Sequence, residues 1–455
     1  MPILPIDSGR YGTKEMKAIF EEESKLFYEL TFEASVADAQ AKLNIIPAEA
    51  AKDIKNIVSS GKITVQRVKE LESASDHDIA AIVEAISELC LDSSKPWIHY
   101  GLTSNDVVDS STSMQMRDVF KIIESKIIQL IKELLIKAKE YQDLPSVGRT
   151  HGQHASITSF GLKFAIWSNE FLDHLTRIKE GEKRFLLCKT LGVVGTGSLM
   201  REKALEVQKL VSQDLDLYPT EAATQVVSRE RYAEMMFIIT LIASTLDKIA
   251  VEIRNLQRSE IGEVQESFKK GQIGSSAVPV KRNPIKSERV SSLARIIRSN
   301  LNVSLENITL WHERDLTNSA NERFIIPMAS ILIDDMIGTM TRIISGLKVN
   351  TDRVMKNIEL TKGQIFAEFV LQGLILKGVP RFDAYRTIQS TAFKALESNE
   401  HFFKALTLEP RIMDNINEEE LKMIFNPQTQ LSASENIIDN IVSKAKTMNV
   451  IPNKS

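Results

Sequence analysis

The sequence predicts an all-α protein built around a bundle of long helices. Apolar residues recur at i, i+3, i+4 and i+7 over several long stretches, which is typical of helices with one buried face. Glycine and proline are sparse, with 19 and 13 in 455 residues, and they cluster between these stretches. No stretch shows a persuasive strand-like alternation of apolar and polar residues.

Five apolar series define the long helices expected in chain order. The series run over residues 116–138, 160–178, 232–256, 290–308 and 328–347. The third series lies in a proline-free segment from about residue 221 to 278, and a single helix over 230–268 would be about 58 Å long. Five long helices predict an elongated central bundle. Their apolar stripes exceed what one core covers, so we expect the chain to assemble into oligomers along the bundle.

Both ends of the chain carry shorter helical patterns. The interruptions fall at Gly61, Pro96, Gly101, Gly378, Pro380, Pro410 and Pro427. We therefore predict an N-terminal helical domain over 1–106, the central long-helix bundle over 107–354 and a C-terminal helical domain over 355–455.

Composition excludes several classes of protein. Hydrophobic residues make up 43% and charged residues 26%, which is ordinary for a globular chain. The net charge of −3 gives no field that favours nucleic acid or an anionic membrane, and no run approaches the 18 apolar residues of a membrane span. The N-terminus lacks a secretory pattern, and Cys90 and Cys188 lack metal-ligand spacing. We expect a cytoplasmic protein without a metal.

Polar residues gather where the helical patterns stop. In SDHDIAA (75–81) the ordinary interpretation is an aspartate N-cap at a helix start. In HYGLTSNDVVDSS (99–111) the corresponding interpretation is that Ser104 or Asn105 is only an N-cap. The alternative is that Thr103 and Ser104, with free backbone amides, bind a carboxylate or phosphate at a helix N-terminus.

Two further segments carry histidine and arginine. GRTHGQHAS (148–156) holds His151 and His154, three residues apart, so a helical turn would put both on one face. A general acid or base role is more plausible than a metal site, because HExxH is absent and no further ligand follows at the right spacing. WHERDLTNSANER (311–323) suits either a solvated, salt-bridged helix face or an anion site.

The stretch GSSAVPVKRNP (274–284) interrupts the helical pattern after the longest series. Its glycines and prolines are typical of a mobile active-site loop, and we expect 269–284 to order when ligand binds. Ser275 and Ser276 are possible nucleophiles or proton carriers, and Lys281 and Asn283 supply donors. G-x-S-x-G and the P-loop spacing are absent, which disfavours an acyl-transfer hydrolase and a P-loop phosphate site.

Extended to GSSAVPVKRNPIKSE, this stretch resembles the signature of the fumarase/aspartase superfamily. Within that superfamily the chain is similar to the adenylosuccinate lyases. The matching segments are SGRYGTKEM (8–16), DHD (76–78), GLTSNDVVD (101–109), GRTHGQHA (148–155), TQVVSR (224–229), KRNPIKSER (281–289) and ERDLTNSANER (313–323). The resemblance implies a fumarase/aspartase-like helical fold and a homotetramer with shared active sites.

The resemblance also implies the reaction. Adenylosuccinate lyases of purine biosynthesis eliminate fumarate from adenylosuccinate, giving AMP, and from SAICAR, giving AICAR, without a cofactor. His151 matches the general acid to the departing nitrogen, and Ser275 matches the base on the flexible loop. The matching substrate-binding residues are Arg10, Tyr11, Asp76, His77, Asp78, Thr103, Ser104, Gln225, Lys281, Asn283, Arg289, Arg314, Ser319 and Arg323. His99 matches a histidine close to the site.

The chain departs from the family pattern at a few positions. Val278 stands in place of the usual methionine, Val280 replaces an aromatic residue or histidine, and Asp76 stands where many members have a basic residue. None of these changes removes a candidate catalytic group.

Two other functions compete with this prediction. Another lyase of the superfamily is disfavoured by Arg10 and Tyr11 and by the set of Arg314, Ser319 and Arg323, because small dicarboxylates need no phosphate site. A non-catalytic helical protein with the same fold is disfavoured by the joint presence of His151, Ser275 and Lys281. The chemistry needs such groups: the carbanion formed by C–H removal is stabilised by preorganised donors, each worth roughly 3–4 kcal/mol.

Overall fold

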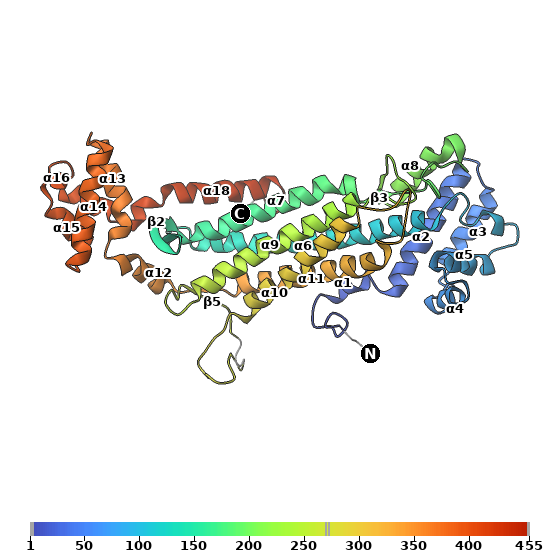
Figure 1. Cartoon of the computed structure of the whole chain (residues 1–455), viewed down its shortest axis with the longest axis horizontal. Coiled ribbons are helices and arrows are strands. Elements are labelled where there is room, and N and C mark those ends of the chain that lie inside the picture. The colour runs from blue at the N-terminus through green and yellow to red at the C-terminus, as the bar shows by residue number, and fades with distance from the viewer. Residues whose placement is uncertain (1–3, 269–270, 272–273, 453–455) are drawn as a thin grey trace. The chain divides into compact units, whose positions relative to one another are not determined.

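The computed structural model describes residues 4–268, 271 and 274–452 and confirms the all-α fold (Figure 1). All five predicted series coincide with long helices, although the last residues of two series, Ile308 and Leu347, lie just beyond the helix ends. These helices are α6 (Ser104–Glu140), α7 (Phe160–Phe185), α9 (Glu230–Leu256), α10 (Ile285–Glu306) and α11 (Ser319–Ser345). The single helix considered over 230–268 is wrong, because the chain turns at Gly262, where φ is 64°, and the amide of Glu263 returns to the Leu256 carbonyl.

Shorter helices precede, separate and follow the long ones. Before and between them lie α1 (Lys14–Ala18), α2 (Glu22–Lys42), α3 (Ala48–Ser59), α4 (Val65–Ser75), α5 (Asp78–Leu89), η1 (Lys95–Trp97), η2 (Arg201–Lys203) and α8 (Ala204–Asp214). After them lie α12 (Thr351–Ile358), η3 (Glu359–Thr361), η4 (Gln364–Phe366), α13 (Ala367–Leu376), α14 (Arg381–Glu397), α15 (Phe402–Thr407), α16 (Pro410–Met413), α17 (Glu418–Ile424), η5 (Pro427–Gln430) and α18 (Ser432–Thr447).

Short strands are present as well, at six places in the described chain where the sequence shows no persuasive alternation. The pairs are β1 (Pro145–Thr150) with β2 (Gln153–Ser159), β3 (Leu187–Cys188) with β4 (Tyr218–Pro219), and β5 (Val264–Gln265) with β6 (Lys348–Val349). Only the β3–β4 pair is parallel. The pairs β3–β4 and β5–β6 join two-residue strands, which are too short to show an alternating pattern.

The β1–β2 pair is a hairpin closed by two residues. His151 and Gly152 form the turn and have φ of 52° and 75°. Two consecutive positive φ values fit a type I′ turn, whose twist matches that of the flanking strands. Turns of this type usually carry Asn-Gly or Asp-Gly, and a His-Gly pair is a weaker signal.

Contacts divide the chain into two compact units. Unit 1 comprises residues 1–127, 174–246 and 292–338, and unit 2 comprises 128–173, 247–291 and 339–455. Each of the five long helices contributes residues to both units. The three-domain division drawn from the sequence stays a prediction.

The interior of unit 1 is formed by the apolar stripes of its long helices. Phe120 of α6 is buried against Phe185 of α7, with ring centroids 5.1 Å apart. Helix α11 is long and apolar enough to cross a membrane by length and composition alone. Of its most apolar window, 67% is buried inside the protein, which is expected of a core helix.

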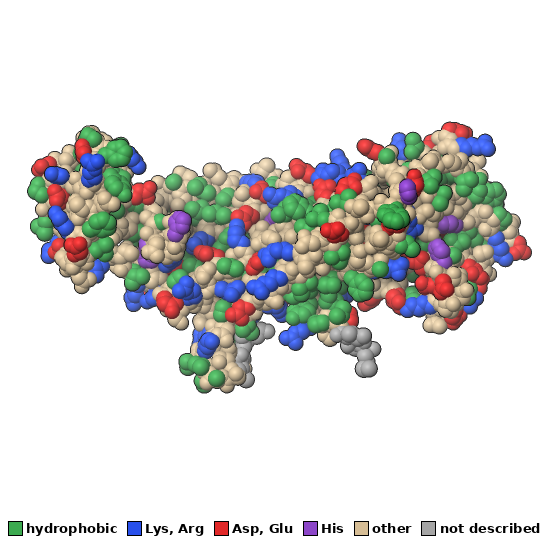
Figure 2. All heavy atoms as spheres, viewed as in Figure 1, with side chains coloured by type: hydrophobic (Ala, Val, Ile, Leu, Met, Phe, Trp, Pro, Cys, Tyr) green, Lys and Arg blue, Asp and Glu red, His purple; other side chains and the backbone are tan. Residues whose placement is uncertain are grey.

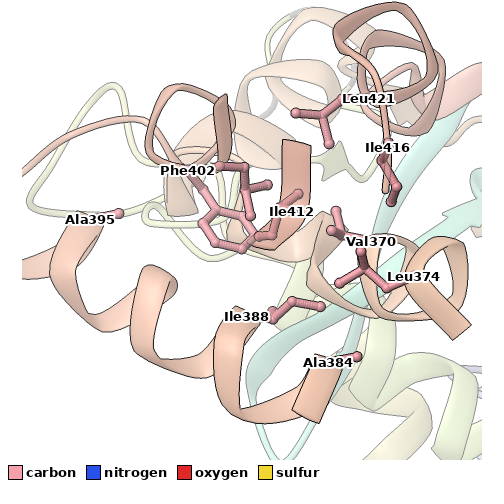
Figure 3. Packing of buried hydrophobic residues seen from close by; sticks show 10 residues of the cluster. Val370, Leu374, Ala384, Ile388, Ala395, Phe402, Ile412, Ile416 and Leu421 are labelled. Carbon is pink, nitrogen blue, oxygen red and sulfur yellow. The ribbon is translucent and has the colours of Figure 1, made fainter. Parts of the chain in front are cut away.

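Unit 2 contains a separate hydrophobic cluster in its C-terminal part. Phe402 of α15 is fully buried beside Leu374 of α13 and Ile388 of α14 (Figure 3). Burial of one such side chain contributes about 1.5–3 kcal/mol.

Candidate active site

In unit 1, α6 begins at the predicted Thr103–Ser104 pair, and a buried ion pair holds this helix start. The Thr103 amide donates to Asp106 Oδ2 at 2.9 Å. Asp106 also contacts Lys189 Nζ and accepts from the Gly192 amide, and neither charged side chain is exposed. Burial raises the pKa of Asp106, although the charge of Lys189 opposes this shift. The arrangement fixes the helix start and leaves the Ser104 hydroxyl half-buried at the surface.

The DHD segment lies beside this helix start. The N-cap of α5 is His77, not an aspartate: its Nδ1 accepts from the Ala80 amide at 3.3 Å. Its Nε2 lies 3.4 Å from Ser104 Oγ, so the structure brings these two candidates together. Asp76 ends α4 in the left-handed region, with φ of 52°, and is exposed. The prediction of an aspartate cap fails because the imidazole supplies an acceptor in the same geometry.

Arg323 and Asp78 form an ion pair in unit 1. Arg323 Nη2 lies 3.4 Å from Asp78 Oδ2, and the arginine side chain is 66% exposed. An exposed guanidinium in a pair this long can exchange its carboxylate for another anion at little cost, because exposed pairs contribute only about 0–1 kcal/mol. Ser319 is half-buried at the first position of α11, one helical turn before Arg323.

Arg314 and Gln225 meet at a cavity of about 350 Å³ in unit 1. Arg314 Nη1 donates to Gln225 Oε1 at 2.6 Å, and the Gln225 side-chain amide donates to the Val193 carbonyl. Arg314 Nε is buried and has no hydrogen-bond partner among the described residues. Burial lowers the pKa of Arg314, and the nearby Arg229 acts in the same direction. A guanidinium with an unused donor beside a cavity is suited to bind an anion.

A buried network supports this arginine site. Arg229 donates to both carboxylate oxygens of Asp109, at 3.1 and 3.0 Å, and to Glu322 at 3.0 Å. The guanidinium also lies over the Tyr232 ring, 4.5 Å from its centroid. These contacts tie α6, α9 and α11 together directly beside Arg323. Asp109, Arg229 and Glu322 lie within the sequence motifs that resemble the family, but the sequence alone predicts no role for them.

The N-terminal segment carries Arg10, which is exposed, and Tyr11, which is half-buried. Close packing holds the following turn, because a Cβ at Gly12 would lie 2.4 Å from Ile331 Cγ2. Thr13 donates through its amide and hydroxyl to Asp334, at 2.8 and 2.9 Å. The structure shows no hydrogen bond from the Arg10 side chain to any other candidate within the described chain.

In unit 2, the predicted acid His151 lies at the exposed tip of the β1–β2 hairpin. His154 lies on β2 opposite Arg149 and is half-buried. Burial and the charge of Arg149 lower the pKa of His154, and its Nδ1 is buried without a described partner. The two histidines therefore do not share a helix face, and only His151 is presented at the turn.

An ion pair anchors the hairpin. Arg149 Nη2 donates to Glu263 Oε1 at 2.6 Å, and Arg149 Nη1 donates to Oε2 at 3.2 Å. Glu263 is fully buried and also accepts from Asn357 Nδ2 at 2.8 Å. Bidentate pairs of this kind are among the stronger hydrogen bonds in proteins, so the strand that leads to His151 is held firmly.

The signature loop, also in unit 2, has internal hydrogen bonds. Ser275 Oγ accepts from the amides of Ala277 and Val278 at 3.3 and 3.1 Å. Asn283 Nδ2 donates to the Gly274 carbonyl at 3.0 Å, and a Cβ at Gly274 would lie 2.1 Å from the Lys281 carbonyl oxygen. Residues 269–270 and 272–273, part of the loop predicted to order on binding, lie outside the described residues.

The remaining candidates of unit 2 are Ser276, Lys281 and Arg289. Ser276 and Lys281 are exposed, whereas Arg289 is half-buried and its Nη2 donates to Thr339 Oγ1 at 2.7 Å. Within the described ranges, no group of three or more His, Cys, Asp or Glu residues could hold a metal ion.

Comparison with known proteins identifies close relatives of the chain. A family model described as "Lyase" matches residues 9–298, and one described as "Adenylosuccinate lyase C-terminus" matches residues 363–441. An adenylosuccinate lyase of Methanocaldococcus jannaschii is 42% identical over 98% of this chain and 96% of its own length. Another adenylosuccinate lyase, from Pyrococcus abyssi, is 40% identical over 98% of this chain and 99% of its own length. A crystal structure of a fumarate lyase from Mesorhizobium sp. BNC1 superposes with a TM-score of 0.87 at 27% identity, covering 97% of this chain and all of that one.

Proposed function

The chain belongs to the adenylosuccinate lyase family, and on that basis we propose that it eliminates fumarate from adenylosuccinate, giving AMP, and from SAICAR, giving AICAR. The observation that carries this proposal is the similarity to adenylosuccinate lyases along 98% of the chain. The matched lyase region, 9–298, includes both the His151 hairpin and the Ser275 loop. Both substrates place the reaction in purine biosynthesis.

The reaction breaks a C–N bond next to a carboxylate. A base removes a proton from the adjacent carbon, which carries the second carboxylate of the succinyl group. The electron pair forms the new C=C bond between the two carbons, and the C–N electrons leave with nitrogen. An acid then protonates the departing nitrogen. The carbanion places extra negative charge on the carboxylate, so donors at that group lower the barrier most.

His151 is the acid in this proposal. Its place at the tip of an anchored hairpin exposes the imidazole to a bound molecule, while Arg149 and Glu263 hold the strand behind it. An imidazole titrates near neutrality and can therefore supply a proton at physiological pH. A general acid of this kind contributes about 10²–10⁴-fold to the rate.

Ser275 is the base. A neutral hydroxyl is a poor base, so the site must stabilise the alkoxide. The two backbone amides that donate to Ser275 Oγ, from Ala277 and Val278, favour negative charge on that oxygen. Lys281 supplies a cation on the same loop, and exclusion of water would strengthen these interactions.

The arginines of unit 1 bind the nucleotide end. Arg314 has an unused donor at the 350 Å³ cavity, and Arg323 is exposed in a weak pair with Asp78. Both are permanent cations with planar forks that match a phosphate. Ser319 supplies a hydroxyl one helical turn before Arg323. Thr103 and Ser104 supply two more hydroxyls at the start of α6.

The chain acts as a homotetramer with active sites shared between subunits. Support comes from large apolar side chains that remain exposed on the long helices (Figure 2). These include Ile136, Ile166, Phe237, Val251, Ile296, Leu305 and Phe324. Burial of apolar surface drives association, so these faces are suited to contact other copies of the chain. Its partners are then its own subunits and small-molecule substrates, without nucleic acid or membrane.

A cytoplasmic location fits the state of the two cysteines. Cys90 and Cys188 are free and buried, and burial raises their pKa values to about 11 and about 12. Thiols that remain protonated in the core are inert and are usual in a reducing compartment.

An absorbance assay with the purified protein tests the proposed reaction. Adenylosuccinate, SAICAR, argininosuccinate and malate are offered separately, and we expect turnover of the first two. Turnover of argininosuccinate or malate without adenylosuccinate would assign the chain to another lyase of the superfamily.

A further inference from the structure

A second cavity of unit 1, of about 440 Å³, is lined by groups suited to an anion. His77 and Ser104 face it from the starts of α5 and α6, Lys95 faces it from η1, and His99 faces it from the segment between η1 and α6. Two imidazoles, an ammonium group and a hydroxyl thus line one space. The cavity also borders the Thr103–Ser104 helix start, where backbone amides favour negative charge.

The imidazole of His99 contacts the carboxylate of Glu33, for which the sequence alone predicts no role. Its Nδ1 lies 2.5 Å from Oε1 of Glu33 on α2, and only 3% of Glu33 is exposed. Among the described residues, His99 is the hydrogen-bond partner that the structure gives Glu33. No described residue forms a hydrogen bond with the second ring nitrogen, Nε2.

The pair favours a charged imidazole. A buried carboxylate without a cation is costly, so Glu33 gains most when His99 carries a proton on each nitrogen. Burial by itself lowers the pKa of His99, but the charge and hydrogen bond of Glu33 outweigh burial and raise it. The other titratable groups around His99 are His77, Glu84 and Lys95 at the cavity and Asp106 on α6, whose charge also raises this pKa.

The backbone at His99 is also constrained. Its φ is 59°, in the left-handed region, which a non-glycine residue adopts only at an energetic cost. Strained residues of this kind persist only where the surrounding structure determines them, and they gather at functional sites. The contact with Glu33 places Nδ1, and not Nε2, against the carboxylate.

We propose that Glu33 is a positioning residue of the lyase reaction, which holds His99 as an imidazolium whose Nε2–H donates to an anionic group of the substrate in this cavity. The inference rests on the proposed function and adds to it a residue on a different helix. The anion is a phosphate or a carboxylate, and both share the oxygen acceptors that an imidazolium binds.

Steady-state kinetics over a range of pH test this role. Glu33→Gln keeps the size of the side chain and an oxygen acceptor but removes the charge. Without that charge His99 loses its proton at lower pH, so KM for adenylosuccinate should start to rise at lower pH than in the wild type. At about pH 8 we expect a KM increase of about tenfold, because a hydrogen bond to a charged group is lost. Competitive inhibition by AMP and by fumarate, measured separately, shows which anionic group loses affinity.

A double-mutant cycle separates positioning from a structural role. His99→Asn is the partner variant, because asparagine tolerates the left-handed backbone but carries no charge. If Glu33 acts through His99, Glu33→Gln should have little further effect on KM in the His99→Asn background. Glu23→Gln removes an exposed carboxylate from the same helix and should leave the pH profile of KM unchanged.

Several outcomes would overturn the inference. Additive KM losses in the cycle, or a Glu33→Gln profile that matches the wild type, would show that Glu33 does not act through His99. If Glu33→Gln does not fold, His99→Asn alone tests the inference. A KM of His99→Asn that equals the wild-type KM at every pH would show that the Glu33–His99 pair binds no anionic group of the substrate. A wild-type protein that does not cleave adenylosuccinate would contradict the proposed function itself. An active wild type whose KM is unchanged by Glu33→Gln would contradict only the role of Glu33.

Discussion

The ammonium group of Lys189 contacts the carboxylate of Asp106 inside unit 1, where neither side chain is exposed to solvent. The contact joins the residue after β3 to the first turn of α6. Asp106 accepts at the same time from the amides of Thr103, Leu191 and Gly192. The candidate anion site at Thr103 and Ser104 therefore depends on a buried charge pair.

Removal of the cation from this pair should destabilise the protein strongly. Lys189→Met leaves Asp106 buried and unpaired, and we expect a loss of about 3–5 kcal/mol in the free energy of unfolding. Urea titration measures the loss. Lys183→Met, which removes an exposed lysine from α7, should change stability by less than about 0.5 kcal/mol.

The loss should also depend on pH. Burial already raises the pKa of Asp106 above its unfolded value, and removal of Lys189 raises it further. A raised carboxyl pKa stabilises the folded state below the unfolded pKa, and that contribution disappears as pH rises through the folded pKa. The deficit of Lys189→Met should therefore be smaller at about pH 5 than at about pH 8. An equal deficit at both pH values would mean that Asp106 does not titrate with folding.

His151 and Ser275 should act as a unit in catalysis. Replacement of either by alanine should lower kcat by at least about 10²–10³, while AMP binding stays nearly intact. The two losses should be less than additive, because one failed proton transfer leaves little transition state for the other group to stabilise. Steady-state kinetics and AMP titration of the single and double variants measure these effects.

His154 is the matched control for the acid. It lies on β2, half-buried beside Arg149, and not at the hairpin tip. His154→Ala should keep most of kcat. An inactive His154→Ala together with an active His151→Ala would exchange the two assignments.

Active sites shared between subunits predict complementation. Mixed tetramers of His151→Ala and Ser275→Ala subunits should regain part of the activity that each variant lacks, since some sites receive both intact residues. Refolding the two variants together and assaying the mixture measures the recovery. A fully active monomer in light scattering would exclude shared sites.

Arg314 and Arg323 should act mainly on substrate affinity. Both are cations without a titratable role near neutrality, so replacement by alanine should raise KM more than it lowers kcat. Some loss of kcat is compatible with this role, because phosphate binding also positions the substrate. Steady-state kinetics on adenylosuccinate separate the two constants, and a large fall in kcat at unchanged KM would place these arginines at the reacting carbon.

Local patterns predicted the helices well and the turns poorly. The apolar series of α6, α7, α10 and α11 depend on a period of about 3.6 residues, which a single stretch of sequence displays. The sequence does not predict the hairpin that carries His151, because its His-Gly turn lacks the usual Asn-Gly or Asp-Gly signal. The sequence does not show where α9 ends either, because a single glycine, Gly262, is a weak signal for a turn.

By itself, the sequence determined the fold class, the family and the motifs that hold His151, Ser275 and the arginines. It determined them because helical periodicity and the signature segments are properties of neighbouring residues. Only the tertiary structure decided which buried charges hold these groups in place. Glu33 and His99 are 66 positions apart, Lys189 and Asp106 are 83 apart, and Arg149 and Glu263 are 114 apart. Such pairs form because burial makes an isolated charge costly, and the partner that offsets the cost is found only after the chain has folded.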